Sequence, residues 1–170
     1  MKSDEALQKL LNAFKRYYDI TQENVLPPFD AQAVFHSHDE KFLLLKEIKL
    51  FEMDSNEHVY FSAGDILTPE KITELSDLAW KDGLSKVKPF YGHRNSDITV
   101  ILLYQSISPE AKEAIRKQRH SKSYKLTFFG WSNFCLAAAD LSRMKFYSNW
   151  FGRDTKSNIK LALTSLIKNV

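Results

Sequence analysis

Apolar residues recur every three or four positions near both ends of the chain, which is the spacing of one helical face. A first helix is predicted over residues 4–19 and a last one over residues 154–168. Two more helices are marked by a capping residue followed by proline, at Thr68-Pro69 and Ser108-Pro109. The pattern therefore predicts four helices.

Strands are predicted between these helices, where apolar residues alternate with polar ones or run together. They fall into two groups of three, at residues 31–37, 41–53, 58–62, 124–129, 134–140 and 144–148. Short polar turns inside each group favour antiparallel pairing, because a parallel crossover needs a dozen or more residues. Between the groups, residues 97–104 are apolar on both faces of the pleat, which predicts a central strand.

The predicted order is α-βββ-α-β-α-βββ-α, which indicates an α+β fold with a mixed or mainly antiparallel sheet and flanking helices. No linker separates the parts, so we expect residues 1–170 to form a single domain. An internal αβββα repeat is a second interpretation. It is supported by Tyr60-Phe61-Ser62 and Phe146-Tyr147-Ser148, which each end a group of strands.

The charge of the chain is distributed unevenly. Its 24 Lys and Arg and 21 Asp and Glu give a net charge of +3. Residues 1–85 hold 9 basic and 16 acidic side chains and residues 86–170 hold 15 and 5, so the halves carry −7 and +10. Such asymmetry is typical of a protein with an anionic partner, or of acidic and basic surfaces that meet within or between copies of the chain.

Composition excludes several protein classes. With 44% apolar and 26% charged residues the chain is globular. Its longest uncharged run, residues 126–139, is too short to span a bilayer, and its start lacks the features of a secretory signal. The lone cysteine, Cys135, lies in an apolar run and is expected in the core. We expect a cytoplasmic location, no membrane partner and no cofactor.

The strongest candidate for binding is a basic and aromatic stretch in the second half. Residues 116–125 contain five cations and no acid, and aromatic residues are dense from residue 124 to residue 151. Cations can neutralise phosphates while exposed rings stack on unpaired bases, so nucleic acid is one expected partner and a protein is another. The candidate residues are Arg116, Lys117, Arg119, Lys122, Lys125, Trp131 and Trp150.

A catalytic alternative uses Asp39, Glu47 and Lys49. Their pattern resembles the Asp…Glu-x-Lys signature of the PD-(D/E)xK nuclease superfamily, and the opening order α-βββ-α-β matches the core of that fold. The resemblance implies that two carboxylates hold a divalent cation while the lysine helps to activate water. Asp39 and Glu47 share a metal only if residues 41–53 break into two strands.

A metal site at His36 and His38 is a weaker candidate. Two imidazoles two residues apart share one face of a strand. The His-Ser-His wording resembles JAMM-type zinc peptidases, but Lys49 stands where that family has a metal-ligating aspartate, and an ammonium cannot bind a cation. Polar histidines on an edge strand are the competing interpretation.

Several segments resemble uncharacterised bacterial hypothetical proteins of similar length. They are Ser121–Lys125, Gly130-Trp131-Ser132, Asp140-Leu141-Ser142 and Tyr147-Ser148-Asn149. This resemblance implies a bacterial origin and no particular activity. The expected function is therefore a non-enzymatic binding module that uses its basic, aromatic half. A nuclease or phosphodiesterase and a homo-oligomeric interaction protein are the alternatives.

Overall fold

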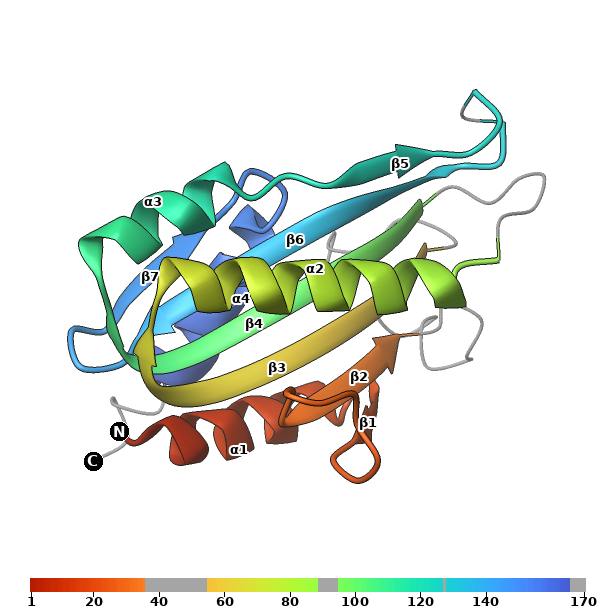
Figure 1. Cartoon of the computed structure of the whole chain (residues 1–170). Coiled ribbons are helices and arrows are strands. Elements are labelled where there is room, and N and C mark those ends of the chain that lie inside the picture. Colours follow the sequence, from red (N-terminus) through yellow and green to blue (C-terminus); the bar gives the residue numbers. More distant parts are fainter. Residues whose placement is uncertain (36–54, 89–94, 127, 166–170) are drawn as a thin grey trace.

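The computed structural model describes residues 1–35, 55–88, 95–126 and 128–165 (Figure 1). Its helices are α1 (Ser3–Phe14), α2 (Pro69–Lys86), α3 (Pro109–Lys117) and α4 (Arg153–Thr164). Its strands are β1 (Asp19–Thr21), β2 (Ala31–Phe35), β3 (Ser55–Leu67), β4 (Asn95–Ile107), β5 (Ser121–Ser123), β6 (Trp131–Asp140) and β7 (Lys145–Ser148).

The strands form one mixed sheet in the order β1-β2-β3-β4-β6-β5, and β7 also pairs with β6. Pairing is antiparallel within each group of strands and parallel between β3 and β4 and between β4 and β6. The parallel pairs follow from α2 and α3, which carry the chain back across the sheet. The predicted α+β class with a mixed sheet is confirmed.

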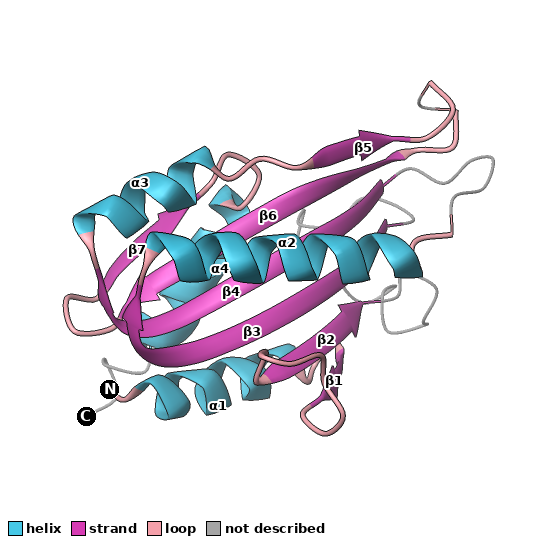
Figure 2. Ribbon diagram, in the orientation of Figure 1, coloured by secondary structure: helices cyan, strands magenta, loops and turns pink. Residues whose placement is uncertain are grey.

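Two pairs of helices cover the two faces of the sheet (Figure 2). Even-numbered residues of the inner strands, such as Tyr60 and Leu102, pack with α2 and α3. Odd-numbered ones, such as Phe61 and Leu103, pack with α1 and α4. Strand β4 lies between β3 and β6 and is buried on both faces, so the predicted central strand is confirmed.

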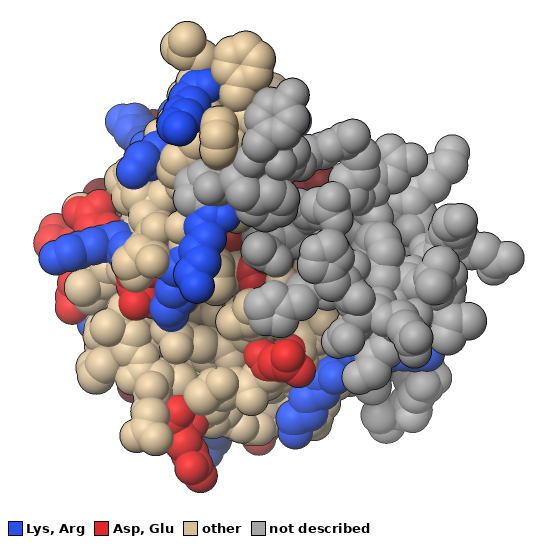
Figure 3. Space-filling model, turned by 90° about the vertical axis from the view of Figure 1, so that its right-hand side faces the viewer, with Lys and Arg blue, Asp and Glu red and all other residues tan. Residues whose placement is uncertain are grey.

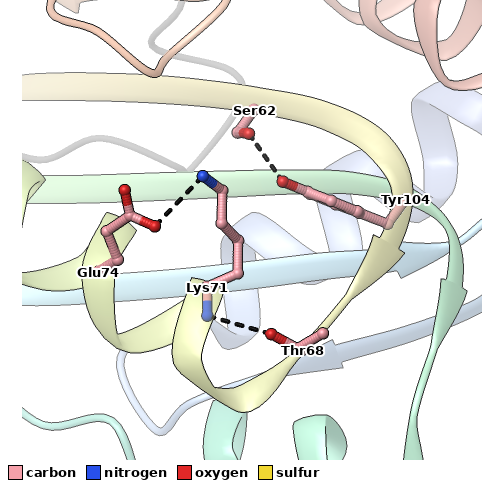
Figure 4. A network of polar contacts seen from close by, with 5 residues as sticks. All are labelled: Ser62, Thr68, Lys71, Glu74 and Tyr104. Carbon is pink, nitrogen blue, oxygen red and sulfur yellow. Dashed lines mark hydrogen bonds and ion pairs between the residues drawn. The ribbon is translucent and has the colours of Figure 1, made fainter.

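The predicted helix starts are also confirmed. Thr68 caps α2 by accepting a hydrogen bond from the Lys71 backbone N–H at 3.3 Å, and Ser108 caps α3 through the Ala111 N–H at 3.1 Å. Beyond the cap of α2, Tyr104 and Ser62 share a buried hydrogen bond, and Lys71 pairs with Glu74 (Figure 4). Because Thr68 directly follows β3, its cap starts α2 at the carboxyl end of that strand.

Three sequence predictions were wrong. The first helix ends at Phe14 rather than Asp19, and Asp19 begins β1, a strand that the pattern did not predict. Residues 124–126 and 128–129 do not form a strand; the pairing with β6 lies just before them, at Ser121–Ser123. The turn expected over residues 54–57 is occupied from Ser55 by β3. The strand predicted over residues 41–53 lies outside the described residues.

The internal repeat is not confirmed. In the first group the last strand, β3, pairs with the central strand β4. In the second group the middle strand, β6, pairs with β4. Tyr60-Phe61-Ser62 therefore lies in an inner strand and Phe146-Tyr147-Ser148 in an edge strand. Across the described ranges, no helix combines the length and apolar character needed to cross a membrane.

Candidate functional site

Strand β6 has an outer edge that two short strands share. β5 pairs with Trp131–Asn133, and β7 pairs with Ala137–Asp140. Asn149 fills the interval between them: its backbone N–H donates to the Leu136 carbonyl, and its side-chain Oδ1 accepts from the Leu136 N–H, both at 3.0 Å. A side chain thus continues the hydrogen-bonding edge where no strand is present.

Asn149 also joins this edge to two neighbouring elements. Its Nδ2 donates to the carbonyls of Phe134 at 2.8 Å and Gln118 at 3.1 Å, and its Oδ1 accepts from the Gly152 N–H at 2.8 Å. Gln118 follows α3 and Gly152 precedes α4, so Trp150 is held beside the segment that leads from α3 into β5.

The hairpin formed by β5, residues 124–130 and the start of β6 extends away from the helices at the upper right of Figure 1. We call residues 121–126 and 128–131 the arm. Its tip folds back through left-handed backbone at Lys125, Leu126 and Gly130, with φ of 45°, 53° and 80°. The Tyr124 N–H donates to the Gly130 carbonyl at 3.0 Å, which closes the tip.

Large apolar side chains on the arm are exposed to solvent. Leu126 is 86% exposed, Phe128 68% and Trp131 42%. These three side chains are therefore not part of the hydrophobic core. Trp150, the other ring among the candidate binding residues, is 63% exposed.

Cations lie over aromatic rings along the arm and beside it. Lys125 Nζ is 4.5 Å from the centroid of the Phe129 ring, and Lys122 Nζ is 5.5 Å from that of Tyr124. The Arg153 guanidinium carbon is 3.4 Å from the centroid of the Trp150 ring. These contacts hold positive charge at defined places on the surface. Phe128 and Trp131 are the arm's most exposed rings.

The structure places the seven predicted binding residues along this one edge. Lys122, Lys125 and Trp131 belong to the arm, and Arg119 connects α3 to it. Arg116 and Lys117 form the exposed last turn of α3, where Lys117 pairs with Glu113 at 3.3 Å. Trp150 directly follows Asn149, which bonds to Leu136 on the same edge of β6. We call these seven residues the basic edge.

Figure 3 views the end of the molecule from which the arm projects. Lys and Arg gather at the top of this view and continue down its centre, whereas Asp and Glu lie mainly at its left and bottom. One contact that links the two halves of the chain is His120 Nε2 with Asp77 Oδ1, at 3.5 Å.

A second polar cluster lies on the face of the sheet that α1 and α4 cover, and the sequence pattern did not predict it. Glu57 of β3 and Asp97 of β4 are paired residues on adjacent parallel strands. Glu57 accepts hydrogen bonds from the Tyr18 hydroxyl and, at 2.6 Å, from Thr99 Oγ1; Asp97 accepts one from Asn95 Nδ2 at 3.0 Å. An acidic residue at an interior-facing strand position would have indicated such a buried cluster. The pattern predicts a turn, and not a strand, at Glu57, so this signal is hidden in the sequence.

Burial raises the pKa of both carboxyls. For Glu57 the hydrogen bonds from Thr99 and Tyr18 act in the opposite direction, and the charge of Asp97 adds to the increase. Burial likewise raises the pKa of the nearby Cys135 thiol, which confirms its expected place in the core. The cluster holds protons more tightly than free carboxyls do. Within the described ranges, no three His, Cys, Asp or Glu residues are grouped to hold a metal ion.

The other sequence candidates, Asp39, Glu47, Lys49, His36 and His38, lie outside the described residues. The nuclease and histidine-metal hypotheses therefore stay predictions.

Comparison with known proteins gives a family without an assigned activity. The model for a "Domain of unknown function (DUF8052)" matches residues 2–161, nearly the whole chain. The chain belongs to this family. No curated protein and no solved structure matches it. The resemblance to an uncharacterised protein family is thus confirmed, and the DUF8052 chain has to be understood from its own residues.

Proposed function

We propose that this DUF8052 protein is a binding module that holds single-stranded nucleic acid along its basic edge. The observation that carries the proposal is the composition of the arm: exposed Phe128 and Trp131 rings lie among Lys122 and Lys125. Residues 116–131 contain five cations and no acid. An anionic polymer with aromatic bases complements such a surface in both charge and shape.

The exposed rings favour nucleic acid over a purely electrostatic partner. Cations neutralise phosphates without regard to what the phosphates carry, so positive charge by itself would suit any polyanion. Phe128 and Trp131 add flat apolar faces, and stacking on such faces stabilises unpaired bases in a sequence-tolerant way. Leu126, the most exposed large apolar residue, supplies a further apolar contact at the tip.

The length of the edge suits an extended strand. Trp131 lies at the start of β6, and Lys122 pairs with its neighbour Ser132. Trp150 follows Asn149, whose backbone N–H bonds to Leu136 farther along the same edge. A single strand that follows the edge would meet a ring at each end and a cation between them. We also propose that residues 1–170 form one domain and that the protein works in the cytoplasm, where nucleic acid is accessible.

Titration of a fluorescent oligothymidylate, followed by anisotropy, tests the proposal. This probe is single-stranded and forms little structure of its own. We expect saturable binding that weakens as salt is added, and weaker binding of the same sequence paired with oligoadenylate. Absence of binding at low salt would reject the proposal and leave a protein partner as the remaining occupant of the arm.

A further inference from the structure

The arm depends on contacts at its root, because its own pairing is short. β5 contributes three residues to the sheet, Ser121–Ser123, and all three are exposed. A short two-stranded hairpin is marginally stable by itself in water. Its direction must therefore be set where it leaves the body of the protein, and His120 is the residue at that point.

The imidazole of His120 packs against two elements at once. It stacks on the indole of Trp80 from α2, with ring centroids 5.4 Å apart and planes 20° apart. It also meets the Phe134 ring of β6 edge-on at 5.1 Å, while Trp80 meets Phe134 at 6.2 Å. Three rings from three parts of the chain thus touch one another at the root of the arm.

The backbone of His120 is fixed at the same place. Its carbonyl accepts a hydrogen bond from the Phe134 N–H at 3.1 Å, one residue before the register of β5 and β6 begins. Farther out, the Tyr124 hydroxyl and Ser132 Oγ are 2.9 Å apart. The stack of His120 on Trp80 connects the root of the arm to α2.

The ring stack contributes more to this joint than the contact with Asp77 does. His120 Nε2 lies 3.5 Å from Asp77 Oδ1, and the Asp77 side chain is 63% exposed. An exposed pair of this kind is strongly screened by solvent. The His120 side chain, by contrast, is 25% exposed and is packed between aromatic rings.

We infer that His120 is a positioning residue that orders the arm by stacking on Trp80, and so prepares the basic edge for its ligand. The effect on binding rests on the proposed function, whereas the effect on the arm does not. A ring of similar size at position 120 should preserve the arm, and loss of the ring should loosen it.

Hydrogen exchange of the free protein tests the effect on the arm directly. In His120→Ala, amides in residues 121–133 should exchange faster than in the wild type, while amides of β3 and β4 should keep their protection, which shows that the fold persists. His120→Phe should restore slow exchange because it retains the ring. Unchanged exchange in His120→Ala, or exchange in His120→Phe as fast as in His120→Ala, would overturn the inference.

Oligothymidylate affinity supplies the second readout. His120→Ala should bind about fivefold more weakly, within the range of one lost aromatic contact, and His120→Phe should recover the affinity. The slope of log K against log salt should stay at the wild-type value, because no phosphate contact is removed. A slope reduced as much as in Lys122→Ala would overturn the inference by showing direct phosphate contact. If the wild type does not bind, the proposed function fails, and hydrogen exchange still decides the role of His120.

Discussion

The side chain of Asn149 occupies the place of a missing strand opposite Leu136, and it is 2% exposed. Its amide makes four hydrogen bonds, two as donor and two as acceptor, which uses its full capacity. This arrangement keeps α3, β6 and the start of α4 together. The basic edge is therefore built on a buried amide rather than on continuous strand pairing.

Replacing Asn149 with Ala should lower the free energy of unfolding by about 3 kcal/mol, because it leaves buried backbone groups without partners. Urea denaturation followed by circular dichroism measures this. Asn158→Ala is the matched control, since Asn158 is exposed on α4 and should change stability by less than about 0.5 kcal/mol. Equal stability of the two variants would contradict the role given to Asn149.

Glu57 should make the protein less stable as pH rises. Burial raises the pKa of its carboxyl in the folded state above 4.5, so the folded protein binds the proton more tightly than the unfolded chain. Stability associated with Glu57 is then greatest below pH 4.5 and falls as pH rises from there through the folded-state pKa. Glu57→Gln removes this titration and retains the shape of the side chain.

The test for Glu57 compares free energies of unfolding of the wild type and Glu57→Gln between pH 4 and pH 8. The variant should gain stability relative to the wild type as pH rises. Glu23→Gln is the control, because Glu23 is exposed and lies outside the helices and strands, and this variant should follow the wild type. If the difference in free energy of unfolding between Glu57→Gln and the wild type did not change with pH, the folded protein would not stabilise the protonated Glu57 carboxyl.

Asp140 should show the opposite dependence. Burial acts to raise its pKa, but hydrogen bonds from Arg143 and Ser142 outweigh it and hold the pKa below 3.8. The stability that the Asp140 carboxylate contributes is fully present above pH 3.8, and it is lost as pH falls through the folded-state pKa. Asp140→Asn should therefore cost about 2 kcal/mol at pH 7 and progressively less toward pH 2.

Thermal unfolding of Asp140→Asn and Ser142→Ala over this pH range checks the prediction. Ser142→Ala removes one of the hydrogen bonds to the carboxylate, at 2.9 Å, and should show a smaller loss of the same sign. The Arg143 side chain is 55% exposed, so most of the effect should come from the hydrogen bonds of the turn rather than from the ion pair. A cost for Asp140→Asn that grows in acid would be incompatible with a lowered pKa.

The exposed rings should contribute to nucleic-acid affinity without contributing to stability. Trp131→Ala and Phe128→Ala should each weaken oligothymidylate binding by about 1–3 kcal/mol, the range for one stacked base, and should leave the melting temperature nearly unchanged. Tyr17→Ala is the control because Tyr17 is 39% exposed but follows α1, away from the edge. Equal losses in Tyr17→Ala and Trp131→Ala would argue against a defined stacking site.

Local signals in the sequence were sufficient for much of the fold. Thr68-Pro69 and Ser108-Pro109 place two helix starts, because cap and first-turn preferences act over a few residues. The apolar run at residues 97–104 identifies the central strand because burial on both faces leaves no polar alternation. Density of cations and rings also selected the residues of the basic edge, and their role in binding stays a prediction.

Other features depend on long-range contacts. Residues 124–129 alternate in sequence like a strand, yet those of them that the structure describes lie in the tip of the arm, where Leu126 and Phe128 are exposed rather than buried. The pairing of Glu57 with Asp97 requires the parallel register of β3 and β4, which spacing along the chain does not specify. The role of Asn149 is equally invisible in sequence, because its partners lie in α3, β6 and α4.

The salt dependence of oligothymidylate binding is the most direct test of the proposed function. We expect log K to fall linearly with log salt, and Lys122→Ala to reduce the magnitude of the slope by about 0.7, the value for one lost phosphate contact with a single strand. Lys9→Ala, which removes an exposed lysine from α1, should keep the wild-type slope. Binding that does not depend on salt, or equal slopes for Lys122→Ala and Lys9→Ala, would contradict a nucleic-acid interface at the basic edge.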